Sequence, residues 1–189
     1  MKRLPRIWLL VVSLAAALPL PAREEILPLT ESRTISITVP DGFSYKAGVN
    51  SKGGLGATLI DEKARVSLQV SFDADGEGEF EDARARRERL FEEFKNYVEG
   101  STQKGMQFVE LAPKVGKGTI CVFTDEKLLG KPVSEYPEGE YLHLTIGVKS
   151  WPGVVATFTL FSNDLKSPQH EAVMKVLRES LHEKPVPLL

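Results

Sequence analysis

An uninterrupted run of β-branched and aromatic residues from Val154 to Phe161 carries apolar side chains on both faces. Such a run is typical of a strand in the middle of a sheet that is covered on both sides. After a short polar loop, Ser167 and Pro168 suit the N-cap and the first position of a helix. Apolar residues then recur at helical spacing, so we expect this helix to continue to about Glu183.

Alternating apolar and polar residues predict strands elsewhere in the chain. In chain order these are residues 34–39, 57–60, 65–72, 107–111, 119–125 and 141–149. Short turns separate most of them. One is Trp151-Pro152-Gly153, whose proline and glycine suit the second and third positions of a type II turn.

A helix is expected between the early and the late strands, from about Phe80 to Val98, where Gly100 ends it. Arginines and glutamates on it form i,i+4 pairs, so we interpret its arginines first as a solvated face. Because hairpins join antiparallel neighbours and the helices must cover the sheet, the predicted fold class is α+β. We expect an α/β/α sandwich with a central, mainly antiparallel β-sheet of about six or seven strands and two main helices.

The N-terminus is typical of a secretory signal peptide. Basic residues precede an apolar run from Ile7 to Leu18, and Ala22 offers a small residue for cleavage. The run is too short to cross a bilayer as a helix. We therefore expect a signal peptide at 1–22, a leader at 23–33, one α+β domain at 34–184 and a tail at 185–189. The mature protein would be periplasmic or secreted, with no stable membrane anchor.

The net charge of the chain limits the kinds of partner that we expect. The chain has 24 basic and 26 acidic residues, and removal of Lys2, Arg3 and Arg6 with the signal leaves 21 against 26, a net charge of −5. Nucleic acid is therefore not an expected partner. The single cysteine, Cys121, cannot form an internal disulfide, and its place in an apolar strand predicts a buried, inert thiol.

An acidic loop holds weak candidates for metal binding. Asp73, Asp75 and Glu77 occupy the first, third and fifth positions of an EF-hand-like calcium loop, but Arg84 stands at the twelfth, where a bidentate glutamate is needed. The alternative interpretation is that these acids favour a helix N-terminus. We predict no cofactor.

No catalytic motif is evident. The glycine-rich bend at 48–56, with Lys52-Gly53-Gly54, lacks the following helix of a phosphate cradle and is predicted to be a flexible loop. His170 and His182 are expected to be exposed on the last helix. His143 lies on the polar side of a strand, where a cross-strand hydrogen bond is favoured over a role as catalytic base.

The segment from Ile35 to Phe43, a strand that ends in a Val-Pro-x-Gly-Phe corner, resembles the PsbP/Mog-like superfamily, which includes exported bacterial DcrB-like proteins. With the hairpins and helices that follow, the resemblance spans roughly residues 34–183. It implies an α/β/α sandwich that serves in assembly, stabilisation or partner binding, with no shared catalytic residues.

These observations favour an exported, non-enzymatic protein-binding or assembly module of the cell envelope, whose partner is another envelope or secreted protein. The alternatives are a periplasmic immunity protein that neutralises a toxin and a hydrolase with an unrecognised site. The polar segment 126–140 is the longest connection, and we expect it to be the most mobile one. We predict that it forms the contact surface through Glu126, Glu135, Glu138 and Glu140, with Tyr136 as an aromatic anchor.

Overall fold

A computed structural model describes residues 22–30, 33–49 and 54–185. All of the predicted signal peptide except Ala22 and the tail beyond residue 185 lie outside the described residues, as do residues 50–53 of the loop predicted at 48–56. None of the described helices is long and apolar enough to cross a membrane.

The chain forms ten strands and two α-helices in the described region. The strands are β1 (Arg23–Pro28), β2 (Arg33–Val39), β3 (Ser44–Val49), β4 (Leu55–Asp61), β5 (Val66–Asp75), β6 (Val109–Glu110), β7 (Lys117–Thr124), β8 (His143–Trp151), β9 (Gly153–Ser162) and β10 (His182–Pro185). The helices are α1 (Ala83–Phe94) and α2 (Pro168–Lys175). Short helical turns accompany them: η1 (Glu79–Glu81), η2 (Lys95–Val98), η3 (Val133–Glu135) and the π-helical η4 (Val176–Ser180).

The main sheet has seven strands in the order β3-β4-β5-β9-β8-β7-β6, and every neighbouring pair is antiparallel. The strand β9 lies at its centre, which agrees with the apolar residues on both of its faces. The turn before β9 has Gly153 at φ 78, the positive value that the third position of a type II turn requires. The predicted fold class is confirmed.

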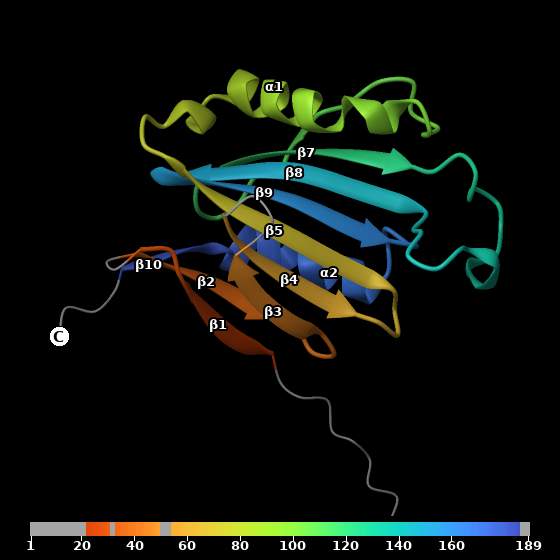
Figure 1. Cartoon of the computed structure of the whole chain (residues 1–189), viewed down its shortest axis with the longest axis horizontal. Coiled ribbons are helices and arrows are strands. Elements are labelled where there is room, and N and C mark those ends of the chain that lie inside the picture. Colours follow the sequence, from red (N-terminus) through yellow and green to blue (C-terminus); the bar gives the residue numbers. More distant parts are fainter. Residues whose placement is uncertain (1–21, 31–32, 50–53, 186–189) are drawn as a thin grey trace, which may run out of the picture.

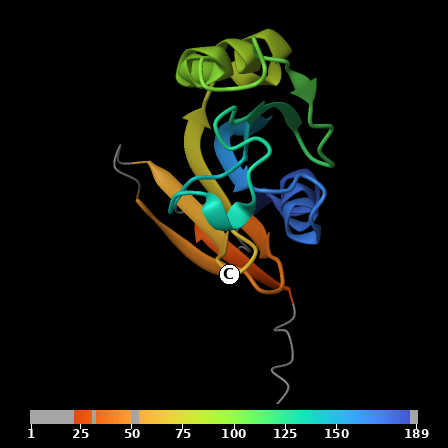
Figure 2. The same ribbon diagram turned by 90° about the vertical axis from the view of Figure 1, so that its right-hand side faces the viewer.

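The molecule has three layers (Figures 1 and 2). On one face of the main sheet α1 packs over β7 and β8, and its fully buried Leu90 contacts a cluster that includes Ile146 and Val148. On the other face lie α2 and a second sheet of three strands, β1-β2-β10. These enclose a larger core, in which Ile37 of β2 and Leu177 of η4 meet residues of β4, β5 and β9.

The second sheet was not predicted. Residues 23–28, expected to belong to an irregular leader, pair with β2 as β1 although only Leu27 is buried. The last helix ends earlier than expected, because the backbone at Leu181 becomes extended and residues 182–185 pair with the other edge of β2. Both segments become strands because they pair with the backbone hydrogen-bonding groups of β2. Their own patterns of apolar and polar residues do not predict a strand.

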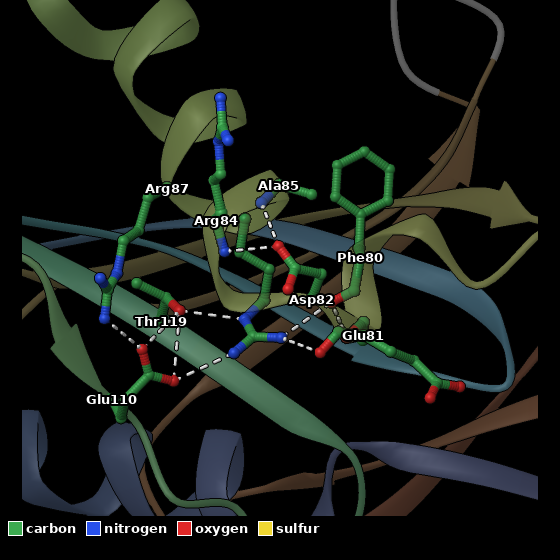
Figure 3. A network of polar contacts seen from close by, with 10 residues as sticks. Phe80, Glu81, Asp82, Arg84, Ala85, Arg87, Glu110 and Thr119 are labelled. Atoms are coloured by element: carbon green, nitrogen blue, oxygen red, sulfur yellow. Dashed lines mark hydrogen bonds and ion pairs between the residues drawn. The ribbon is translucent and has the colours of Figure 1, made fainter.

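A buried arginine joins α1 to the sheet. The side chain of Arg86 donates from Nε to Thr119 Oγ1 at 2.9 Å, from Nη1 to the carbonyl oxygens of Phe80 and Glu81 at 2.9 and 2.8 Å, and from Nη2 to Glu110 Oε2 at 3.0 Å. Glu110 also accepts from Arg87 and Thr119 (Figure 3). The arginines of α1 are therefore not all solvated, since Arg86 is 2% exposed.

The sheet also buries a lysine. Lys149 on β8 is 1% exposed, and its ammonium donates to the carbonyl oxygens of Leu177 and Leu181, where η4 ends. Because η4 and Leu181 cover this side chain, water does not reach the amine. Burial lowers the pKa of Lys149 to about 8.

This burial predicts a pH dependence. Between pH 8 and 10.5 the unfolded chain keeps a proton on Lys149 that the folded chain has lost, so the free energy of unfolding should rise with pH. The full change corresponds to roughly 3 kcal/mol. Urea unfolding at several pH values should show that Lys149→Met lacks this rise, whereas the exposed Lys46→Met keeps it. A wild-type slope equal to that of Lys149→Met would contradict the prediction.

Candidate functional site

The weak candidates for metal binding, Asp73, Asp75 and Glu77, do not converge. Asp73 pairs with Arg89 at 2.6 Å, and the buried carboxylate of Asp75 accepts from the backbone N–H groups of Glu79 and Phe80. Glu77 is exposed. Among the described residues no group of three or more His, Cys, Asp or Glu side chains could hold a metal ion. The carboxylate of Asp75 instead caps the turn η1, in line with the alternative interpretation of the acidic loop.

The residues with catalytic potential lie mostly in the interior. His143 Nδ1 is 3.1 Å from Thr124 Oγ1 on the adjacent strand, which confirms the predicted cross-strand contact. The prediction of an exposed His170 is wrong, because its ring is 5% exposed and its Nδ1 lies 3.0 Å from Ser162 Oγ. Burial lowers the pKa of both histidines. Ser162 is fully buried, so this pair is closed to a substrate.

Cys121 is a buried free thiol on β7, as predicted. Burial raises its pKa, which keeps the sulfur in the less reactive thiol form. It lies in the core cluster beneath α1 and contributes packing there.

A groove of about 300 Å³ opens at the end of the main sheet where α1 and η2 finish. Six aromatic and aliphatic side chains line it: Tyr97, Phe123, Tyr141, Leu142, Leu144 and Phe161. One wall comes from the end of η2 and Gly100, the opposite wall from residues 139–142, and the floor from β7, β8 and β9. We call this feature the aromatic groove.

The rings of the aromatic groove are arranged as two pairs. Tyr97, 49% exposed, stacks on Phe123 with 6.1 Å between the ring centroids and an interplanar angle of 28°. Tyr141 lies tilted on Phe161 at 5.3 Å. The inner ring of each pair comes from a strand, so the sheet fixes both outer rings in place. A concave, largely preformed apolar surface with a few polar groups is the usual form of a binding site.

Two acidic residues of the described chain line the aromatic groove. Asp125 and Glu140 both line it, and no lysine or arginine does among the residues that the structure describes there. Asp125 Oδ1 accepts from the N–H of Lys127, and its Oδ2 has no hydrogen bond to the described part of the chain. The adjoining segment 125–140, which we call the rim, contains five acids and two lysines and is therefore negatively charged.

Arg65 holds the wall of the groove that residues 139–142 form. It lies in the turn between β4 and β5 with φ 52, a conformation that few residues other than glycine adopt. Its guanidinium donates to the carbonyl oxygens of Val133 at 3.2 Å, Pro137 at 3.4 Å and Glu140 at 2.8 Å. It also lies 5.8 Å from the ring centroid of Tyr141. The connection 126–140 is therefore fastened at several points.

The predicted contact residues divide into two groups. Glu126, Glu135, Glu138 and Glu140 are exposed, and of these Glu140 lines the groove while Glu126 forms an ion pair with Lys104 at 3.6 Å. Tyr136 does not lie where an exposed anchor was expected. Its side chain is 8% exposed, its hydroxyl donates to the carbonyl of Lys131, and its ring is 5.9 Å from Arg65. Its ring packs inside the connection 126–140. The aromatic rings at the surface are therefore those of other residues.

The role of Arg65 leads to a testable expectation. Arg65→Ala removes three hydrogen bonds from a charged donor, each worth about 1 kcal/mol or more, so amide hydrogen exchange in residues 133–140 should become at least about tenfold faster. Lys63→Ala, an exposed change in the same turn, is the matched control. Equal exchange in the two variants would mean that the wall does not depend on Arg65.

No known protein family, curated protein or solved structure matches this chain.

Proposed function

We propose that this chain is an exported, non-enzymatic protein-binding or assembly module of the cell envelope, and that its partner docks in the aromatic groove. The observation that carries the proposal is the half-exposed ring of Tyr97, held in place by Phe123 at the mouth of a preformed concavity. Exposed, rigid tyrosines lose little conformational entropy on binding, and they often dominate the energy of protein interfaces.

The surroundings of the groove support a protein partner. Glu140 lines the groove, and the other exposed glutamates belong to the same connection 126–140. Together they would form a polar rim around an apolar centre, the usual organisation of an interface. The acidic rim would also attract a basic partner surface during encounter. The PsbP/Mog-like resemblance of residues 34–183 and the three-layered architecture are compatible with such a role.

Site-specific photo-crosslinking tests the proposal. A photoreactive amino acid at Asn96, an exposed residue that lines the groove, should capture a discrete partner when the full chain is exported in its own host. The same amino acid at Lys46, on the opposite edge of the sheet, should not. Capture at both positions, or at neither, would contradict docking in the groove.

Two glycines provide a matched pair of blocking variants. A Cβ at Gly100, which lines the groove, or at Gly105, which does not, meets no atom within 4 Å. Gly100→Trp should therefore fill the groove and abolish crosslinking at position 96 without unfolding the chain. Gly105→Trp should leave the crosslink intact.

The rim can be tested in the same assay. Charge reversal of Glu126, Glu135, Glu138 and Glu140 should weaken capture by at least tenfold, because each reversed charge repels a basic partner. Unchanged capture by this fourfold variant would place the contact elsewhere.

A further inference from the structure

We propose that the aromatic groove recognises an arginine side chain that its partner presents. This inference rests on the proposed function and deepens it, because it specifies the chemical group that enters the groove. Three features of the groove favour this group: its aromatic rings, the Oδ2 atom of Asp125, which accepts no hydrogen bond from the described residues, and a described lining without lysine or arginine.

The rings suit a flat cation. A guanidinium is attracted to the face of a tyrosine or phenylalanine ring within about 6 Å of the centroid, and it also stacks on such rings through its own plane. Tyr97 presents a half-exposed ring at the groove, and Tyr141 forms part of the opposite wall. A purely aliphatic partner would use the apolar floor but not this property of the two tyrosines.

The protein already uses this contact in its own structure. The guanidinium of Arg65 lies 5.8 Å from the ring centroid of Tyr141 and 5.9 Å from that of Tyr136. A cation–π contact between arginine and tyrosine thus helps to hold the wall of the groove, and the partner's arginine repeats that contact within the groove.

The carboxylates provide the counter-charge. Asp125 Oδ2 accepts no hydrogen bond from the described residues, and Glu140 is the second acidic residue that lines the groove. Arginine forms strong, charge-assisted hydrogen bonds to carboxylates, which are often bidentate. A lysine ammonium would gain the charge attraction but would lose the planar stacking. Arginine therefore matches the rings and the carboxylates together.

The test uses N-acetylarginine amide as a probe of the full mature chain, followed by NMR chemical-shift changes. Its dissociation constant should be on the order of millimolar, as suits a single residue, and the shifts should map to the groove. N-acetylcitrulline amide, which is neutral and nearly isosteric, should bind at least tenfold more weakly. N-acetyllysine amide should fall between them. Equal binding of the arginine and citrulline probes, or shifts outside the groove, would overturn the proposal.

Two variants separate the contributions of charge and ring. Asp125→Asn should weaken the arginine probe about tenfold and leave citrulline binding unchanged. Tyr97→Leu, which keeps an apolar side chain, should weaken the arginine probe severalfold. The NMR spectrum of each variant shows directly that it is folded. If neither change affects the arginine probe, the inference is wrong.

A competition experiment distinguishes a failure of the arginine proposal from a failure of the proposed function. If the photo-crosslink at position 96 forms and is blocked by Gly100→Trp but excess arginine probe does not compete with it, the groove docks a partner through another group. If the crosslink does not form, the protein-docking function itself fails.

Discussion

Replacing Arg86 with methionine is expected to lower the free energy of unfolding by roughly 3 kcal/mol, because it leaves buried acceptors without a donor. Methionine keeps most of the apolar volume, so the loss reports the hydrogen bonds. Thr119 Oγ1 and the carbonyl oxygen of Glu81 would lose their contacts with the guanidinium. Water cannot readily replace them, since α1 and η1 close this region over β7 and β8.

The matched control lies on the same helix. The side chain of Arg84 is 86% exposed and pairs only with Glu88 at i,i+4 among its ionic partners in the described chain. Arg84→Met should therefore change stability by less than about 0.5 kcal/mol. Urea unfolding of both variants measures the difference. If they lost similar amounts of stability, the network around Arg86 would contribute no more than a surface pair.

Replacing Gly147 with alanine is expected to cost at least about 3 kcal/mol through steric overlap. Gly147 on β8 lies opposite Phe158 on β9, and a Cβ at position 147 would be 2.1 Å from Cζ of that ring. Phe158 is 1% exposed in the larger core, so the ring has little room to move. The sheet needs a glycine here because the ring occupies the space above it.

A second substitution tests whether the ring of Phe158 causes the loss of stability. Phe158→Leu removes the clashing ring atoms, so the double variant with Gly147→Ala should be more stable than the sum of the two single losses predicts. Gly48→Ala on β3 is the control, since its Cβ meets no atom within 4 Å. Thermal or urea unfolding of the four variants measures the coupling. Strict additivity would show that the ring and the glycine do not interact.

The local pattern of apolar and polar residues was sufficient to predict most strands of the main sheet. The alternation of residues 65–72 predicted β5, and the two-sided apolar run at 154–161 predicted the central place of β9. Ser167 caps α2 as predicted, through a hydrogen bond from the N–H of His170. These features follow from nearest neighbours along the chain, so the sequence records them directly.

The candidate site could be predicted only in part. The four glutamates predicted to form the contact surface in segment 126–140 are exposed, but Tyr136 is buried and Arg65, from a distant turn, holds the segment. Tyr97 and Tyr141 are separated by more than forty residues, and no local pattern indicates that they meet around one groove. Their juxtaposition depends on how η2 and β8 pack.

The sequence by itself determined the fold class, the order of most strands and the position where α2 begins, because hydrophobic periodicity and capping act over a few residues. The first helix was expected from about Phe80, but α1 begins at Ala83. Tertiary structure alone decided that Lys149 and His170 are buried, that residues 182–185 form a strand and that four aromatic rings enclose a groove. Each of these depends on which surface covers a residue, and that surface comes from segments far away in the chain.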